Sequence, residues 1–173
     1  TTAGLFYGAG ALWQLATEDG GTGQARLPAV SISDAPRFAW RGLLLDSARH
    51  FQSIDDIKRL VDVMALHRLN VLHWHLTDDQ GWRLEIKSLP ALTATGAWRV
   101  PRTGYWGNRQ PPGDGEPATD GGFYTQDEMR DIIRYAAGRC IQILPEIDVP
   151  AHSLAAIASY PWLSCSKQLY HVN

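Results

Sequence analysis

The sequence has 173 residues, of which 45% are hydrophobic and 20% charged, and its formal net charge is −2 at pH 7. This composition is typical of about one globular domain, and the small charge gives no reason to expect nucleic acid or an anionic membrane as a partner. No apolar run approaches the ~18 residues of a membrane span, and the two cysteines match neither a disulfide framework nor a metal-site spacing.

The first part of the chain is irregular. Residues 3–16 predict a short helix, and the glycine-rich segment 20–23 marks a break. Residues 27–32 alternate enough to predict a short strand.

From about residue 38, short apolar runs alternate with amphipathic segments. The predicted strands cover residues 40–46, 70–76 and 140–150, and the first and third of them have the apolar character of buried strands. The predicted helices cover residues 53–70, 124–139 and 153–160. Ser53 with Asp56, and Thr125 with Glu128, predict capping boxes at the first two helices.

This βαβαβα order predicts an α/β fold with parallel strands and right-handed crossovers. An open doubly wound sheet and a (β/α)₈ barrel both fit, and no phosphate-binding glycine motif follows a strand. Charged residues follow the carboxyl end of each strand, where the active sites of barrels lie, so the barrel is favoured.

The connection from about residue 88 to residue 122 is too long for a plain link between a strand and a helix. It is rich in proline and glycine and includes Trp98, Tyr105 and Trp106. Either it is an excursion over the strand ends, with Trp106 as a possible pocket-lining residue, or it is an ordered loop of no special role.

His73 and His75 point to the same face of the second strand. An H-x-H pair at a strand end can hold a catalytic metal, so a metal-dependent barrel hydrolase stays open as an alternative. The other reading is that both histidines are hydrogen-bonded inside the barrel.

Asp78 and Asp79 are consecutive, so in an extended segment they point to opposite sides. We therefore expect at most one of them to work in a pocket, and a turn-forming role for both remains open.

Glu146 and Asp148 share a face at the end of the third strand, where ionised carboxylates need partners. His152 follows within reach of the same pocket, and a buried contact between an aspartate and this histidine would fix its tautomer. Arg49, after the first strand, is suited to bind hydroxyl or carboxylate groups.

Three segments, 41–51, 72–83 and 145–152, resemble in order and spacing the first half of family 20 glycoside hydrolases, the β-N-acetylhexosaminidases. The resemblance implies a partial (β/α)₈ TIM barrel of about the first three βα units in residues 31–173. It also implies that residues 1–30 are the end of a small α/β domain and a linker.

The reaction implied by the resemblance is removal of terminal β-linked N-acetylglucosamine or N-acetylgalactosamine with retention, assisted by the substrate's own acetamido group. It implies no cofactor, a carbohydrate partner and a periplasmic or secreted location. By the same resemblance Arg49 holds sugar hydroxyls, and Asp78 and His152 support an acid/base glutamate. Asp79 and Asp148 are pocket-lining or structural, and Glu146 is a further possible pocket-lining residue.

Two departures from the family pattern matter. Ala151 stands where the family usually has glycine, which would be strained if that position requires a positive φ. The family's catalytic Asp-Glu pair follows a fourth barrel strand, and these residues include no such segment. We therefore expect the chain alone to be inactive and either marginally stable or self-associated; a non-catalytic piece that binds sugar or a partner chain is the other alternative.

Overall fold

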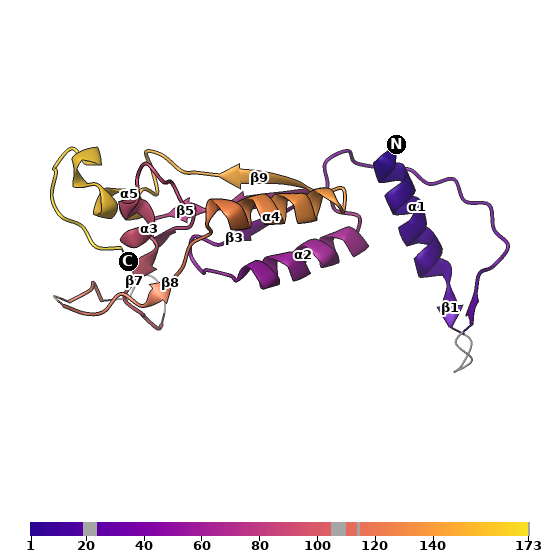
Figure 1. Cartoon of the computed structure of the whole chain (residues 1–173), viewed down its shortest axis with the longest axis horizontal. Helices are drawn as coiled ribbons and strands as arrows, with labels where there is room; N and C mark the ends of the chain where they lie inside the picture. Colours follow the sequence, from indigo (N-terminus) through magenta and orange to yellow (C-terminus); the bar gives the residue numbers. More distant parts are fainter. Residues whose placement is uncertain (19–23, 105–109, 114, 173) are drawn as a thin grey trace.

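The computed structural model describes residues 1–18, 24–104, 110–113 and 115–172. Its centre is a parallel sheet in the order β3 (Gly42–Asp46), β4 (Val71–His75) and β9 (Gln142–Glu146). Figure 1 labels β3 and β9 of this sheet. Helix α2 (Ile54–Leu66) connects the first two strands, and α4 (Gln126–Ala137) precedes the third. The predicted alternation of parallel strands and helices is therefore confirmed for these elements.

The two helices pack against one face of the sheet and against each other (Figure 1). This face carries the apolar residues of the central strand, and Trp74 is fully buried there, with its indole N–H donating to Ser47 Oγ at 2.8 Å. The core comprises Ile57, Val61 and Met64 from α2, Leu72, Trp74 and Leu76 from β4 and after it, Tyr124, Met129, Ile132 and Ala136 around α4, and Ile141. The helical spacing of the apolar residues thus predicts the buried face correctly.

Both helices begin at the predicted caps. The Ser53 hydroxyl accepts from the Asp56 amide at the start of α2, but the Asp56 carboxylate binds the Ser53 hydroxyl rather than its amide, so the predicted box is only half formed there. Thr125 and Glu128 form the predicted reciprocal capping box at the start of α4. Carboxylates in the first turn of each helix also favour the positive end of its dipole.

The opposite face of the sheet carries His73 and His75 at its centre, flanked by Leu44 on β3 and Leu144 on β9. Leu44 is 55% exposed and Leu144 is 38% exposed. The prediction that the first and third strands are buried is therefore wrong for this chain, because both are edge strands of the described sheet and only β4 has a neighbour on each side.

The N-terminal part lies beyond the amino ends of these strands (Figure 1). Helix α1 (Thr2–Leu15) confirms the predicted helix, and β1 (Thr17–Glu18) pairs with β2 (Ala25–Arg26) in a short antiparallel ladder. The strand predicted at 27–32 does not form, since that segment has no strand beside it and its apolar side chains are exposed.

The remaining elements surround the carboxyl ends of the sheet. Strand β5 (Thr77–Asp78) forms a hairpin with β6 (Gly81–Trp82), and β7 (Trp98–Arg99) pairs with β8 (Asp120–Gly121) at the base of the long connection. Helices α3 (Ala91–Ala94), α5 (Leu154–Ser159) and the 3₁₀ turn η2 (Pro161–Leu163) lie next to them. No helix among the described residues is long and apolar enough to cross a membrane.

Candidate functional site

The charged residues singled out in the sequence gather at the carboxyl ends of the three parallel strands. The strand register aligns Asp46, His75 and Glu146, the last residues of β3, β4 and β9. The hairpin of β5 and β6 follows β4 at these strand ends, and β9 is followed by the loop that carries Asp148 and His152. Residues from three separate segments therefore meet at the carboxyl ends of the parallel strands.

Asp78 is the centre of this group. It is 2% exposed, and its Oδ2 forms an ion pair with Arg49 Nη2 at 2.6 Å and lies 3.0 Å from His75 Nε2. Its Oδ1 accepts from the Asp79 amide at 2.7 Å and lies 3.3 Å from His152 Nδ1. A buried carboxylate is stable only with such partners, and here nitrogen donors surround both oxygens.

The backbone holds Asp78 in this position. The Leu76 amide donates to the Glu146 carbonyl at 3.1 Å, which extends the parallel pairing past the end of β4. The Asp148 amide donates to Thr77 Oγ1 at 2.9 Å, which ties the loop after β9 to the β5 hairpin. The segment bearing His152 is therefore fixed against the segment bearing Asp78.

Asp79 contributes more than the sequence predicts. Its Oδ1 accepts from the Leu154 amide at 3.0 Å, and its Oδ2 lies 3.5 Å from His152 Nδ1. The expectation that only one of the two aspartates reaches the site assumes an extended segment, but β5 ends at Asp78 and a turn follows. Both carboxylates therefore face the same histidine.

The positive φ considered for Ala151 falls instead on the next residue. His152 has φ of 53°, and Ala151 is not among the described residues with a positive φ. Alanine at 151 is therefore compatible with the backbone of this loop. The His152 side chain is 53% exposed.

Arg49 is held from one side and open on the other. Its amide and Nη1 both donate to Asp46, at 3.1 and 2.8 Å, and its side chain is 42% exposed. Burial alone would raise the pKa of the Asp46 carboxyl, but the hydrogen bonds and charge of Arg49 hold that pKa below its ordinary value. The guanidinium is thus oriented by two carboxylates and still reaches the solvent at the strand ends.

The two histidines of the H-x-H pair both bind Glu146. His75 Nδ1 lies 2.8 Å from Glu146 Oε1, and His73 Nε2 contacts Oε2. Burial opposes a charge on His75, but the hydrogen bonds with Asp78 and Glu146 raise the pKa of its imidazole above the ordinary value. Burial likewise opposes ionisation of Glu146, while the hydrogen bond and charge of His75 lower its pKa.

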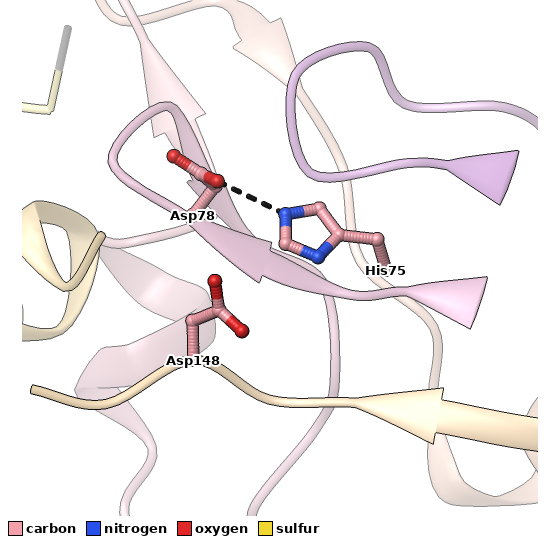
Figure 2. A group of neighbouring side chains, drawn as sticks. All are labelled: His75, Asp78 and Asp148. Atoms are coloured by element: carbon pink, nitrogen blue, oxygen red, sulfur yellow. Dashed lines mark hydrogen bonds and ion pairs between the residues drawn. The ribbon is translucent and has the colours of Figure 1, made fainter. Parts of the chain in front are cut away.

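Among the residues that the structure describes, two groups of side chains are close enough to surround a cation: His75, Asp78 and Asp148, drawn in Figure 2, and Asp78, Asp79 and His152. In the first group the ring nitrogens of His75 already bind Glu146 and Asp78, the latter contact being the dashed line in Figure 2. The second carboxylate oxygen of Glu146 also contacts His73 Nε2. The geometry therefore favours the hydrogen-bonded reading of the H-x-H pair over the metal-dependent alternative.

Sequence reasoning missed Arg83, which follows the β5–β6 hairpin and is 1% exposed. Its guanidinium donates to the backbone carbonyls of Ser47 at 2.9 Å and Ala97 at 2.6 Å. Further bonds run to Ala48 at 2.8 Å, Gly122 at 3.1 Å and Gln80 at 3.4 Å. Burial and the nearby positive charge of Arg99 lower the pKa of Arg83 to about 10, so it stays protonated at neutral pH. The available signal was its position directly after "DDQGW", but its partners are carbonyls that no side-chain pattern reveals.

The structure brings together seven of the predicted site residues: Arg49, Asp78, Asp79, His152, His75, Glu146 and Asp148. His73 joins them through Glu146. Trp106, the remaining candidate, lies outside the described residues.

Comparison with known proteins gives consistent matches. Residues 38–173 match the model of glycosyl hydrolase family 20, catalytic domain. A beta-hexosaminidase of Vibrio furnissii is 48% identical over 161 residues, which cover 92% of this chain and 25% of that protein. The N,N'-diacetylchitobiase of Vibrio harveyi is 42% identical over 91% of this chain and 18% of its own length.

Solved structures agree with these relatives. A family 20 exo-β-N-acetylglucosaminidase of Vibrio harveyi, in complex with N-acetylglucosamine, has a TM-score of 0.81 and 47% identity over 92% of this chain and 24% of its own. A mutant β-hexosaminidase of Streptomyces plicatus has a TM-score of 0.84 and 38% identity, and covers 100% of this chain and 33% of its own. The 173 residues therefore span about a third or less of each of these relatives. The chain belongs to glycosyl hydrolase family 20.

Proposed function

We propose that the whole protein removes terminal, non-reducing β-linked N-acetylglucosamine or N-acetylgalactosamine from oligosaccharides, chitin fragments or glycoconjugates. The names of the relatives, beta-hexosaminidase and N,N'-diacetylchitobiase, support this substrate class. The observation that carries the proposal is the buried carboxylate of Asp78, which contacts both Arg49 and His152 at the edge of a parallel sheet where such sites form.

The proposed mechanism is substrate-assisted and retains the configuration. The oxygen of the 2-acetamido group attacks the anomeric carbon, while a glutamate gives its proton to the departing glycosidic oxygen. Water then opens the oxazolinium intermediate from the same face as the departed group, and the same glutamate takes the proton from that water. Two displacements at one carbon restore the β configuration.

In this scheme the described residues hold and orient. Asp78 and Asp79 face His152, which would bind the acid/base glutamate and keep its proton available. Arg49 would donate to hydroxyl groups of the terminal sugar through its exposed nitrogens. The acid/base glutamate and the residue that orients the acetamide are proposed to come from outside these 173 residues.

The same proposal includes the domain arrangement. Residues 31–173 would form about the first three βα units of a (β/α)₈ barrel, and residues 1–30 the end of a small α/β domain with its linker. The parallel β3–β4–β9 sheet with α2 and α4 on one face, and His73 and His75 at the centre of the other, is consistent with a segment of a barrel wall.

An assay of the full-length protein tests this function. We expect 4-nitrophenyl N-acetyl-β-glucosaminide or galactosaminide to be hydrolysed with the β-anomer as the first product by NMR, and the β-glucoside, which lacks the acetamide, to be inert. Successive fluorination of the acetyl methyl should lower kcat stepwise, because it weakens the attacking oxygen. Inversion at the anomeric carbon, or equal cleavage of the β-glucoside, would contradict the proposal.

A further inference from the structure

His75, the last residue of β4, lies between the carboxylates of Glu146 and Asp78. Its Nδ1 is 2.8 Å from Glu146 Oε1 and its Nε2 is 3.0 Å from Asp78 Oδ2, and the residue is 5% exposed. A neutral imidazole has one N–H donor and one lone pair, whereas an ionised carboxylate only accepts. Both hydrogen bonds can form together only if both ring nitrogens carry a proton.

The other donors around the two carboxylates favour their ionised forms. The Asp79 amide donates to Asp78 at 2.7 Å, and Arg49 Nη2 forms an ion pair with it at 2.6 Å. Glu146 contacts His73 Nε2 through its second oxygen. A proton placed on Asp78 would therefore displace a donor that is already present. The lowered pKa of Glu146 favours its ionised form too, so the proton belongs on His75.

The charges that face His75 come from every element packed around it. Strand β3 and its turn present Asp46 and Arg49, the β5 hairpin presents Asp78, and β9 with its loop presents Glu146, Asp148 and His152, with His73 on the same strand as His75. The carboxylates Asp46, Asp78, Glu146 and Asp148 outnumber the one arginine of this group. A second positive charge on His75, which is 5% exposed, offsets part of this excess of negative charge.

We propose that His75 is a positioning residue: a buried imidazolium, anchored by Glu146, that fixes the Asp78 carboxylate in the orientation in which it meets His152. The family resemblance assigns roles to Arg49, Asp78 and His152, but none to His75. The protonation of His75 does not depend on the proposed function. Only the purpose of the Asp78 orientation, which is to support His152 in catalysis, rests on that function. The raised pKa of His75 and the lowered pKa of Glu146 agree with the charges that the geometry requires.

The protonation of His75 is measured directly in the full-length protein labelled with ¹⁵N-histidine. We expect both ring nitrogens of His75, assigned through their loss in His75→Gln, to resonate as protonated nitrogens at pH 7. In Glu146→Gln the anchor loses its charge, so His75 should release its proton at a lower pH than in the wild type. A neutral His75 ring at pH 7 in the wild type, or a titration unchanged by Glu146→Gln, would overturn the proposal.

Kinetics separate positioning from general support of the fold. Glutamine at 75 is uncharged, so the acidic limb of the kcat/KM profile should move to higher pH by about one unit or more as Asp78 loses the facing charge. kcat/KM should fall at least about tenfold at the wild-type optimum, mainly through kcat. His67→Gln is the matched control: His67 is exposed at the C-cap of α2, at the other end of the sheet, and both profile and rate should stay unchanged. A His75→Gln enzyme with lower activity but an unchanged profile would refute positioning.

The two measurements keep the two proposals apart. If the full-length protein does not act on N-acetylhexosaminides, the proposed function fails, while the NMR titration still decides whether His75 is an imidazolium. If His75→Gln does not fold, the comparison of wild type with Glu146→Gln still decides it, and the ring resonances are then assigned by elimination with variants of the other histidines.

Discussion

At the scale of single residues, the site depends on where a negative charge is buried. Asp78 has lost nearly all contact with water and receives Arg49, His75, His152 and the Asp79 amide in exchange. Removal of this charge is destabilising, because it leaves the nitrogen donors around Asp78 without an ionised partner.

Asp78→Asn tests this in the full-length enzyme. We expect kcat/KM for an N-acetyl-β-hexosaminide to fall at least about a hundredfold, because the neutral amide loses the ion pair with Arg49 and no longer gives His152 an ionised partner. Asp34→Asn, which removes the exposed partner of Arg68, is the same chemical change at the other end of the sheet and should leave the rate unchanged. Similar losses in the two variants would show that Asp78 has no special role.

The pair of His75 and Glu146 predicts a dependence of stability on pH. The folded pKa of Glu146 is below its ordinary 4.5, so its contribution is present above that value and is lost as the pH falls through the lowered pKa. The folded pKa of His75 is above its ordinary 6.5, so its contribution is complete below 6.5 and is lost as the pH rises through the raised pKa. Both contributions are present between these two ordinary values.

The measurement is the difference in thermal unfolding midpoint between the wild type and Glu146→Gln across pH. We expect the difference to be largest at about pH 5 to 6 and to shrink on both sides. A difference that stays constant from pH 4 to 9 would mean that the two charges do not stabilise each other.

At the scale of secondary structure, the sequence predicts what depends on local pattern. The apolar spacing in α2 and α4, and their caps at Ser53 and Thr125, correctly gave two helices and the face that each buries. The segment 27–32 was wrongly predicted as a strand, since a strand requires a neighbour and alternation alone does not supply one. The same limit applies to Asp79, whose direction is set by a turn rather than by strand alternation.

Arg83 is the feature at this scale that no pattern predicts, because it acts on the backbone. It joins the turn after β3 to one end of the β7–β8 ladder, where Ala97 and Gly122 lie opposite each other, through carbonyl groups. At Gly121 the chain has φ of 151°, and a Cβ there would lie 1.9 Å from the Ala97 carbonyl oxygen, so the joint also requires a glycine.

Replacement of Arg83 by methionine should destabilise the protein severely. It leaves several buried carbonyl groups without a donor, at a cost of about 1–3 kcal/mol each, so we expect at least about 3 kcal/mol in total. The readout is the unfolding midpoint of the full-length protein in denaturant. Arg59→Met on the exposed face of α2, where Arg59 pairs only with Asp56 among the described residues, is the control and should cost little.

At the scale of the whole molecule, the described sheet has two open edges, and the face that carries His73 and His75 also has exposed leucines. β3 and β9 each lack a neighbour on one side among the described residues, and Leu44 and Leu144 are only partly covered. Open parallel edges and apolar surface favour association with other chains. The fold class was predictable from the order of elements, whereas the exposure of the edge strands depends on which other strands are present.

The 173-residue chain produced alone is therefore expected to self-associate and to show no turnover. Sedimentation velocity at several concentrations, with a chromogenic N-acetylglucosaminide assay of the same samples, measures both. A monomer at all concentrations, or hydrolysis above the buffer rate, would contradict this expectation.

The placement of α1 has a practical consequence. Arg41, which precedes β3, donates to the Tyr7 hydroxyl at 3.2 Å and to the carbonyls of Phe38 and Arg68 at 2.7 Å, and so fastens this helix to the amino ends of the strands. Strand β5, which carries Asp78, lies beyond the carboxyl ends of the parallel strands (Figure 1). If the protein is immobilised through the exposed side of α1, its candidate site will therefore face away from the support.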